Sequence, residues 1–259
     1  MTDIQEKPVG DREENLIIGR NAILEALRSD RTIDSLYVAR GNRAGAISAL
    51  LAKAKAKGIV IKEADPKKLD FLCGHANHQG VVAVAAVKAY ASLDDLFRLA
   101  EERGEPPFFI IADGLHDPHN LGAVIRTAEC AGAHGVIVPK RHSTGLTYAV
   151  GKASAGAVEY LPVARVSNLA AAMDELKKRG VWIYAADMDG ERWCDVDYSG
   201  AVALVVGSEG DGVGRLVKEK SDFIVSLPIR GNVNSLNASV ACGILCYEVV
   251  RSRMAAQAK

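Results

Sequence analysis

The sequence predicts an α/β protein with two domains, and three features of the chain lead to this prediction. Segments typical of strands alternate with segments typical of helices along most of the chain. Strand-like runs such as 108–114 and 201–207 are apolar throughout, as expected for parallel strands that are covered on both faces. A charged helix within 91–107 ends in a glycine and two prolines. This break separates a small domain from a larger one.

Composition and charge limit the class of protein. The chain has 259 residues, which is ample for a substantial core, and a formal net charge of zero. The neutral charge excludes a global basic field but leaves room for a local basic patch. The charged N-terminus is unlike a signal peptide, and no run of eighteen apolar residues predicts a membrane span. Five cysteines without any CxxC pair indicate reduced thiols and a cytoplasmic location.

The N-terminal third is expected to form a small domain over residues 15–87, after a loose arm at 1–14. An apolar run and an amphipathic helix share residues 16–29, and the following segments alternate between strands and helices. The expected strands are 33–39, 59–64 and 75–87, and the expected helices are 44–58 and 66–74. Lys53, Lys55 and Lys57 are typical of a solvated helix face. With Arg40 and Arg43 they could instead form a modest RNA-facing patch.

Residues 88–107 are interpreted as a linker, and 108–259 as the larger domain. Its expected strands are 108–114, 134–139, 161–166, 181–187, 201–207 and 223–229. Its expected helices are 120–132, 146–160, 169–180 and the apolar part of 231–253. In an open α/β sheet, ligands bind at the carboxyl ends of the strands, so polar loops that follow strands are candidate sites.

The first such loop is 113–126, which follows an apolar strand and runs into a helix. It carries more polar groups than a connection needs, namely Asp113, His116, Asp117, His119, Asn120 and Arg126. An Asx turn and a helix cap at Asn120 would explain some of them without any function. They would not explain Arg126, which we expect to be buried in an apolar helix and therefore to need an anionic partner.

The second loop, 207–214, has four glycines in eight residues and exposes backbone N–H groups to a ligand. It does not match the dinucleotide-binding pattern, because Arg215 stands where the third glycine is required. It does not match the phosphate-loop pattern either, because Val213 stands where a lysine is required. Glu209 disfavours a phosphate and suits a cationic or hydroxyl-bearing ligand. A plain hairpin remains the simpler alternative.

The third stretch, 231–253, begins with Asn and Ser residues and continues as a helix rich in small side chains. Asn234, Ser235 and Asn237 are helix-start residues, and one of them is expected to cap the helix. Together they suggest that a polar ligand is held at the N-terminal end of the helix. The histidine pairs 75/78 and 116/119 lack zinc-site patterns, so no metal is expected. A GxSxG elbow of a serine hydrolase is also lacking.

In this order and spacing the three motifs resemble the SpoU (TrmH-type) family of RNA ribose 2′-O-methyltransferases in the SPOUT superfamily. The matching segments are DPHNLGAVIRTAECAGAHGVIVP (117–139), LVVGSEGDGV (204–213) and SLPIRGNVNSLNASVA (226–241). LIIGRNAILEAL (16–27) and HQGVVA (78–83) are similar to the family's small substrate-binding domain. The two-domain layout is most similar to bacterial enzymes that methylate a guanosine of large-subunit rRNA.

The resemblance implies a deep trefoil knot in the C-terminal domain, S-adenosylmethionine as cofactor, and a homodimer whose active site is completed across the interface. Residues that match the family's catalytic positions are Asn120, Arg126, Glu209, Ser235 and Asn237. Residues implied to hold the cofactor are Ala186, Asp187, Gly207, Ser208, Gly210, Leu227, Pro228, Ile229, Ser235, Leu236 and Asn237. Because a guanidinium is a poor base, we assign Arg126 to electrostatic stabilisation of the nascent alkoxide.

The expected function is therefore 2′-O-methylation of RNA, with a guanosine of 23S rRNA as the expected target. A tRNA methyltransferase of the same family is the same-class alternative. A non-catalytic RNA-binding factor in ribosome assembly and a nucleotide-binding hydrolase are the alternatives from other classes. The intact motif residues argue against the non-catalytic RNA-binding factor. The mismatch with the phosphate-loop pattern argues against the nucleotide-binding hydrolase.

Overall fold

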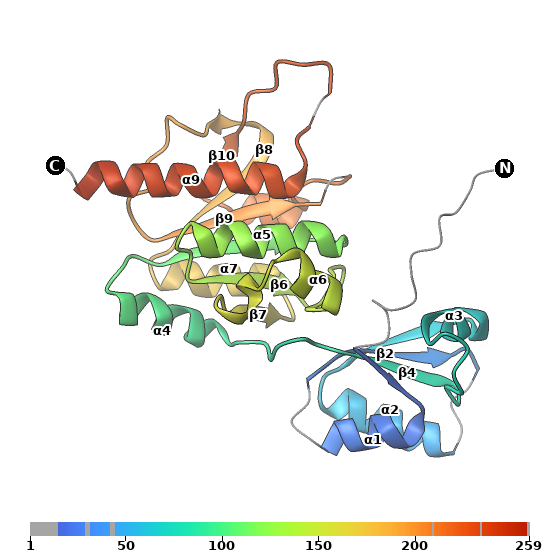
Figure 1. The fold of residues 1–259 in the computed structure, drawn as a ribbon. Coiled ribbons are helices and arrows are strands. Elements are labelled where there is room, and N and C mark those ends of the chain that lie inside the picture. The colour runs from blue at the N-terminus through green and yellow to red at the C-terminus, as the bar shows by residue number, and fades with distance from the viewer. Residues whose placement is uncertain (1–14, 29–31, 42–44, 209, 234, 258–259) are drawn as a thin grey trace. The chain divides into compact units, whose positions relative to one another are not determined.

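A computed structural model describes residues 15–28, 32–41, 45–208, 210–233 and 235–257. The chain divides into two compact units (Figure 1), the first built mainly from residues 1–89 and the second mainly from 90–259. The predicted α/β class is confirmed. The division falls inside the segment 88–107 that we interpreted as a linker, and helix α4 (Leu93–Arg103) of that segment contributes Leu96 and Phe97 to the core of the second unit.

The first unit is a four-stranded sheet in the order β1-β4-β2-β3. Its strands are β1 (Leu16–Ile18), β2 (Ile33–Ala39), β3 (Val60–Ala64) and β4 (Val81–Ala85), and only β2 and β3 run parallel. Helices α1 (Arg20–Arg28) and α2 (Ala46–Ala56) share one apolar core with the sheet, and α3 (Pro66–Leu72) shares another. Asp65 caps α3 by accepting a hydrogen bond from the backbone of Lys67.

The second unit is a six-stranded parallel sheet in the order β10-β8-β9-β5-β6-β7. Its strands are β5 (Phe108–Asp113), β6 (Gly135–Pro139), β7 (Val163–Val166), β8 (Trp182–Arg192), β9 (Val202–Gly207) and β10 (Phe223–Ser226). The central strands β5 and β9 are buried almost throughout. Burial on both faces explains their unbroken apolar sequences.

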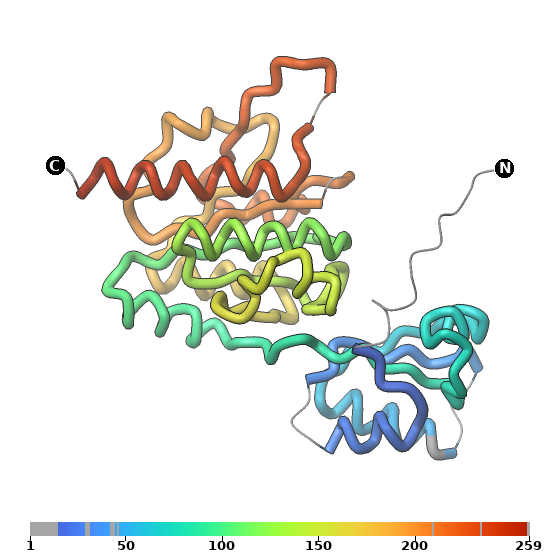
Figure 2. Tube along the Cα trace, in the orientation of Figure 1, coloured from blue at the N-terminus to red at the C-terminus, as the bar shows by residue number. Residues whose placement is uncertain are grey.

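Helices cover both faces of this sheet. Helices α4 (Leu93–Arg103), α7 (Leu169–Lys178) and α8 (Arg215–Lys220) bury apolar side chains in one core. Helices α5 (Pro118–Cys130) and α9 (Ala238–Gln257) lie side by side in the traces of Figures 1 and 2 and pack against each other. The segment 146–160, expected as one helix, is instead α6 (Tyr148–Ala153) followed by a short 3-10 turn (Ala157–Glu159), with Gly156 between them in a left-handed conformation.

Strand β8 is longer than expected because its pairing with β10 is interrupted. Tyr184 and Ala185 pair with the first two residues of β10, whereas the next pairs begin only at Glu191. Residues 186–190 therefore bulge out of the ladder, as an inserted stretch does when the partner strand has no matching residues. Gly190 is required at the end of this bulge, since a Cβ there would lie 2.5 Å from the carbonyl carbon of Ile224.

At the amino edge of the sheet, His134 is fully buried and holds two segments together. Its Nδ1 accepts a hydrogen bond from the backbone N–H of Phe108 at 3.0 Å, and its Nε2 lies 3.1 Å from the carboxylate of Glu105. Burial lowers the pKa of His134 below the ordinary value of 6.5, despite the opposing effect of Glu105. The imidazole is therefore neutral in the folded protein near neutral pH.

This histidine predicts a pH dependence of stability. Between the lowered folded pKa and 6.5, the unfolded chain binds a proton that the folded chain does not, so stability rises with pH across this window. We expect the melting temperature to fall as the pH is lowered from neutral through 6.5. In His134→Asn the amide oxygen can still accept the hydrogen bond from Phe108. The fall of the melting temperature with decreasing pH in this window should be lost in this variant. Parallel melting profiles for the two proteins would contradict the assignment to His134.

Candidate functional site

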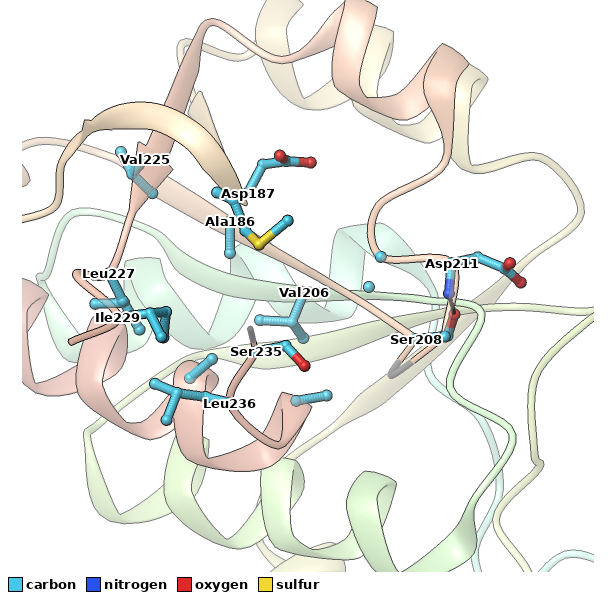
Figure 3. Close-up of a pocket in the computed structure, with 16 residues that line it drawn as sticks. Ala186, Asp187, Val206, Ser208, Asp211, Val225, Leu227, Ile229, Ser235 and Leu236 are labelled. Carbon is cyan, nitrogen blue, oxygen red and sulfur yellow. Dashed lines mark hydrogen bonds between the residues drawn. The ribbon is translucent and has the colours of Figure 1, made fainter. Parts of the chain in front are cut away.

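A cavity of about 330 Å³ opens at the carboxyl edge of the parallel sheet (Figure 3). Strands β8, β9 and β10 each lead into it, and the start of α9 closes it from the other side. The lining residues are Ala186, Asp187, Met188, Val206, Gly207, Ser208, Gly210, Asp211, Gly212, Val225, Leu227, Ile229, Ser235, Leu236, Ala238 and Ala241. Its volume lies in the range of small-molecule sites, roughly 300–1,000 Å³.

The bulge of β8 forms one wall, because residues 186–188 belong to the stretch that leaves the ladder. Asp187 is fixed there by an ion pair with Lys218 of α8, with 2.6 Å between Oδ2 and Nζ. Burial alone would raise the pKa of Asp187, but hydrogen bonds and charge from Lys218 and neighbouring backbone N–H groups outweigh it and lower the pKa. The pocket therefore contains a carboxylate held ionised and oriented.

The glycine-rich loop after β9 forms a second wall. Ser208 and Gly212 exchange two backbone hydrogen bonds of 3.1 and 3.0 Å, so the loop folds back on the end of the strand. A Cβ on Gly207 would lie 2.0 Å from the carbonyl carbon of Gly212, so only glycine fits. The carboxylate of Asp113, at the end of β5, accepts a 2.7 Å hydrogen bond from the backbone of Gly214 and anchors the loop. Glu209 lies outside the described residues.

The start of α9 connects the third motif to the first. Asn237 caps the helix. Its Oδ1 accepts hydrogen bonds from the backbone N–H of Ser239 at 2.9 Å and from the hydroxyl of Ser239 at 2.6 Å. Its Nδ2 donates a 2.9 Å hydrogen bond to Oδ1 of the buried Asn120 in the first turn of α5. One side chain thus caps α9 and ties it to α5, between the cavity-lining residues Leu236 and Ala238. Asn234 lies outside the described residues.

Arg126 is placed differently from our expectation. Its side chain is exposed on α5 and is not among the residues that line the cavity, so the prediction of a buried arginine is wrong. The physical reason is the helical spacing. Asn120, Val124 and Ile125 point towards buried surroundings, while Arg126 is on the side of α5 that nothing within this chain covers among its described residues.

Nine of the residues implied to hold the cofactor line this cavity: Ala186, Asp187, Gly207, Ser208, Gly210, Leu227, Ile229, Ser235 and Leu236. Pro228 and Asn237 do not line it, although both adjoin lining residues in the chain. The sequence reasoning missed seven lining residues: Met188, Val206, Asp211, Gly212, Val225, Ala238 and Ala241. Six of them are within two positions of an implied residue, and Ala241 is one helical turn after Asn237, so a wider window around the motifs would have included them.

Other kinds of site find no support in the described part of the chain. No group of three or more His, Cys, Asp or Glu residues there is arranged to hold a metal ion. Over the same residues, none of the helices combines the length and the apolar character needed to cross a membrane.

The parallel sheet, its edge cavity and the small unit together define a two-unit α/β protein with a cavity of small-molecule size at the carboxyl ends of its strands. Comparison with known families identifies it further. Residues 107–247 match the SpoU rRNA Methylase family, and residues 16–91 match the RNA 2′-O ribose methyltransferase substrate binding family. The chain belongs to the SpoU methylase family.

Individual relatives agree with this assignment. The chain is 50% identical over 243 residues to YacO of Bacillus subtilis, which is named for the TrmH family of tRNA/rRNA methyltransferases; the match covers 93% of this chain and 97% of YacO. Among solved structures, the AdoMet complex of the SpoU methyltransferase AviRb from Streptomyces viridochromogenes matches with a TM-score of 0.59 and 27% identity, over 93% of this chain and 90% of AviRb. An AdoMet-bound rRNA methyltransferase from Sinorhizobium meliloti matches with a TM-score of 0.57 and 26% identity, over 92% and 87% of the two chains.

Proposed function

We propose that this protein transfers a methyl group from S-adenosylmethionine to a ribose 2′-hydroxyl of RNA, and that its target is a guanosine of large-subunit rRNA. The observation that carries the proposal is the cavity built from three separate segments and tied to α5 by the Asn237–Asn120 hydrogen bond. Membership of the SpoU family supports the reaction type, and the AdoMet complex of AviRb supports the cofactor.

The residues of the cavity fit S-adenosylmethionine by their chemistry. Apolar side chains of Leu227, Ile229 and Leu236 offer a surface for a flat base (Figure 3). The backbone of the glycine-rich loop can approach a ligand closely. The carboxylates of Asp187 and Asp211 suit hydroxyl groups and a positive charge, and they disfavour a nucleotide phosphate.

When bound, the cofactor supplies a methyl group activated by a sulfonium. The protein must then orient the acceptor hydroxyl and stabilise the charge that develops on it. The Asn237–Asn120 contact fixes the rim over which the ribose approaches, and Ser235 lies beside it on the cavity wall. We assign Glu209 to positioning of the ribose and Arg126 to stabilisation of the alkoxide.

A homodimer belongs to this proposal, because Arg126 lies outside the cavity of its own chain. Helix α9 presents apolar side chains at helical spacing with large exposed fractions: Val240 50%, Ile244 39% and Tyr247 54%. A second copy of the chain would cover this surface and bring its own Arg126 to the cavity. The trefoil knot implied by the family is likewise proposed for the second unit. Light scattering should give twice the 27.5 kDa of one chain.

The choice of rRNA over tRNA rests on how much of the chain each relative matches. The rRNA methyltransferase from Sinorhizobium meliloti aligns with 92% of the chain and so includes the substrate-binding unit. The A. aeolicus TrmH/SpoU tRNA modifying enzyme aligns with only 63% of this chain, with a TM-score of 0.54, 28% identity and 85% of its own length covered. The additional unit favours a large, structured RNA as substrate.

The test is transfer of tritiated methyl groups from S-adenosylmethionine to RNA from a strain that lacks the gene. We expect incorporation into 23S rRNA but not into tRNA, and mass spectrometry should locate it on a guanosine ribose. Incorporation into tRNA alone would contradict the assignment of rRNA and show that tRNA is the substrate. RNA binding without any incorporation would favour an assembly factor over an enzyme.

The Asp187–Lys218 ion pair gives a further prediction for the cofactor pocket. Lys218→Met should weaken S-adenosylmethionine binding by about tenfold, because Asp187 loses both its orientation and the charge that keeps it ionised. Lys218→Arg should restore most of the affinity. The matched control is Lys220→Met: Lys220 is on α8 like Lys218, and it forms a similar 2.6 Å ion pair with Asp174 of α7, away from the cavity. Equal losses in both Met variants, measured by calorimetry, would show a general effect on α8.

A further inference from the structure

The loop after β6 carries two cations that no carboxylate of the described residues neutralises. Lys140 and Arg141 follow directly on Pro139, the last residue of the strand, and Arg141 is exposed. Neither forms an ion pair with a residue that the structure describes. We propose that residues 140–144, here called the β6 loop, bind the phosphates of the RNA strand beside the methylated nucleotide. This inference rests on the proposed function and names a contact with its substrate.

Several other cations of the second unit are already paired with carboxylates of the protein. Four of them pair with carboxylates at short range: Lys177 with Asp222 at 2.7 Å, Arg179 with Asp94 at 2.7 Å, Arg215 with Glu219 at 2.7 Å and Lys220 with Asp174 at 2.6 Å. An ion pair already neutralised within the protein attracts a polyanion weakly. Lys140 and Arg141 have no such partner among the described residues, so their charge is available to RNA.

The β6 loop is held in a fixed shape next to the site. The backbone N–H of Thr144 and the hydroxyl of Ser143 both donate to the carbonyl of Leu115, at 2.8 and 3.1 Å. His142 adopts a left-handed backbone with φ of 57°, which is uncommon for a residue with a side chain. Leu115 belongs to the loop that leads from β5 into α5. The β6 loop is thus attached to the segment that carries Asn120.

Strand order places the β6 loop where a flanking nucleotide would lie. Strand β9, which ends at the cavity, is followed in the sheet by β5 and then by β6. With about 4.8 Å between neighbouring strands, the β6 loop begins roughly 10 Å from the end of β9. Carboxylates of the intervening loop are already engaged, Asp113 with the backbone of Gly214 and Asp117 with that of His119. Both carboxylates keep their charge but are held by these hydrogen bonds, and an RNA strand can run from the cavity over the start of α5 to Lys140 and Arg141.

The experiment compares the full-length protein with the double variant Lys140→Ala/Arg141→Ala, using an unmodified 23S rRNA transcript as probe. Binding is measured by filter retention across a series of salt concentrations. Loss of two phosphate contacts should lower the slope of log K against log salt by about 1.4, because each contact with a single strand contributes about 0.7. Affinity should fall about tenfold, with a higher KM for RNA, an unchanged kcat and unchanged S-adenosylmethionine binding.

The control is Arg98→Gln/Lys178→Gln, which removes the same charge from helices α4 and α7. This variant should keep the wild-type slope within error. An unchanged slope in the β6-loop variant, or an equal decrease in the control, would overturn the inference. Failure of the proposed function would look different: the wild-type protein would transfer no methyl group to any RNA, while the salt series would still decide whether Lys140 and Arg141 bind phosphates.

Discussion

Replacement of Gly207 by alanine should abolish S-adenosylmethionine binding with only a moderate loss of stability. The new methyl group would lie 2.0 Å from the carbonyl carbon and 2.1 Å from the carbonyl oxygen of Gly212, and 2.3 Å from the backbone nitrogen of Val213. Backbone cannot swing aside as a side chain can, so the loop must move. Overpacking of this kind costs roughly 1–3 kcal/mol. Misplacement by about 1 Å can cost about 100-fold in reaction rate, and we expect a loss of at least this size in S-adenosylmethionine affinity when this wall moves.

Gly210→Ala is the matched control, since Gly210 lines the same cavity and a Cβ there meets nothing within 4 Å. Calorimetry and thermal melting of the two variants separate the effect of the collision from that of glycine flexibility. We expect Gly210→Ala to bind S-adenosylmethionine within about threefold of wild type. If Gly207→Ala also bound normally, the glycine-rich loop would not be a wall of the cofactor site.

The sequence predicted the α/β class and most strands, because strands buried on both faces have unbroken apolar runs. It did not predict α8, whose six residues bury only Val217 and whose N-cap, Gly214, makes no side-chain hydrogen bond. Without periodicity or a capping residue, such a short helix leaves no local signal. Lys218, the partner of Asp187, was missed with it.

The cavity could be predicted only in part, because its walls depend on pairing between distant segments. The bulge at residues 186–190 arises from the register between β8 and β10, which neither sequence segment specifies alone. The motifs did indicate both ends of the Asn237–Asn120 contact, but as separate polar clusters. The sequence supported the function of Arg126 through its motif, whereas our argument from burial failed because the exposed side of α5 cannot be identified without knowing what packs on it.

Replacement of Arg126 by alanine should reduce methyl transfer about 100- to 1,000-fold, the usual cost of removing a group that stabilises a developing oxyanion. S-adenosylmethionine affinity should remain within about threefold of wild type, because Arg126 does not line the cavity. Its exposure on α5 makes a folding defect small. Single-turnover transfer and calorimetry measure the two quantities separately. A large loss of cofactor binding would contradict the role assigned to Arg126.

Mixing the two inactive variants tests whether Arg126 acts in the cavity of the partner subunit. In a mixed dimer of Arg126→Ala and Gly207→Ala, the first chain has an intact cavity and the second an intact arginine. If the arginine crosses the interface, one complete site forms in each mixed dimer. Equal mixing should then restore about a quarter of wild-type activity, since half of the dimers are mixed and each has one working site of two. If Arg126 serves its own chain, both cavities of the mixed dimer lack an essential part, and mixing restores nothing.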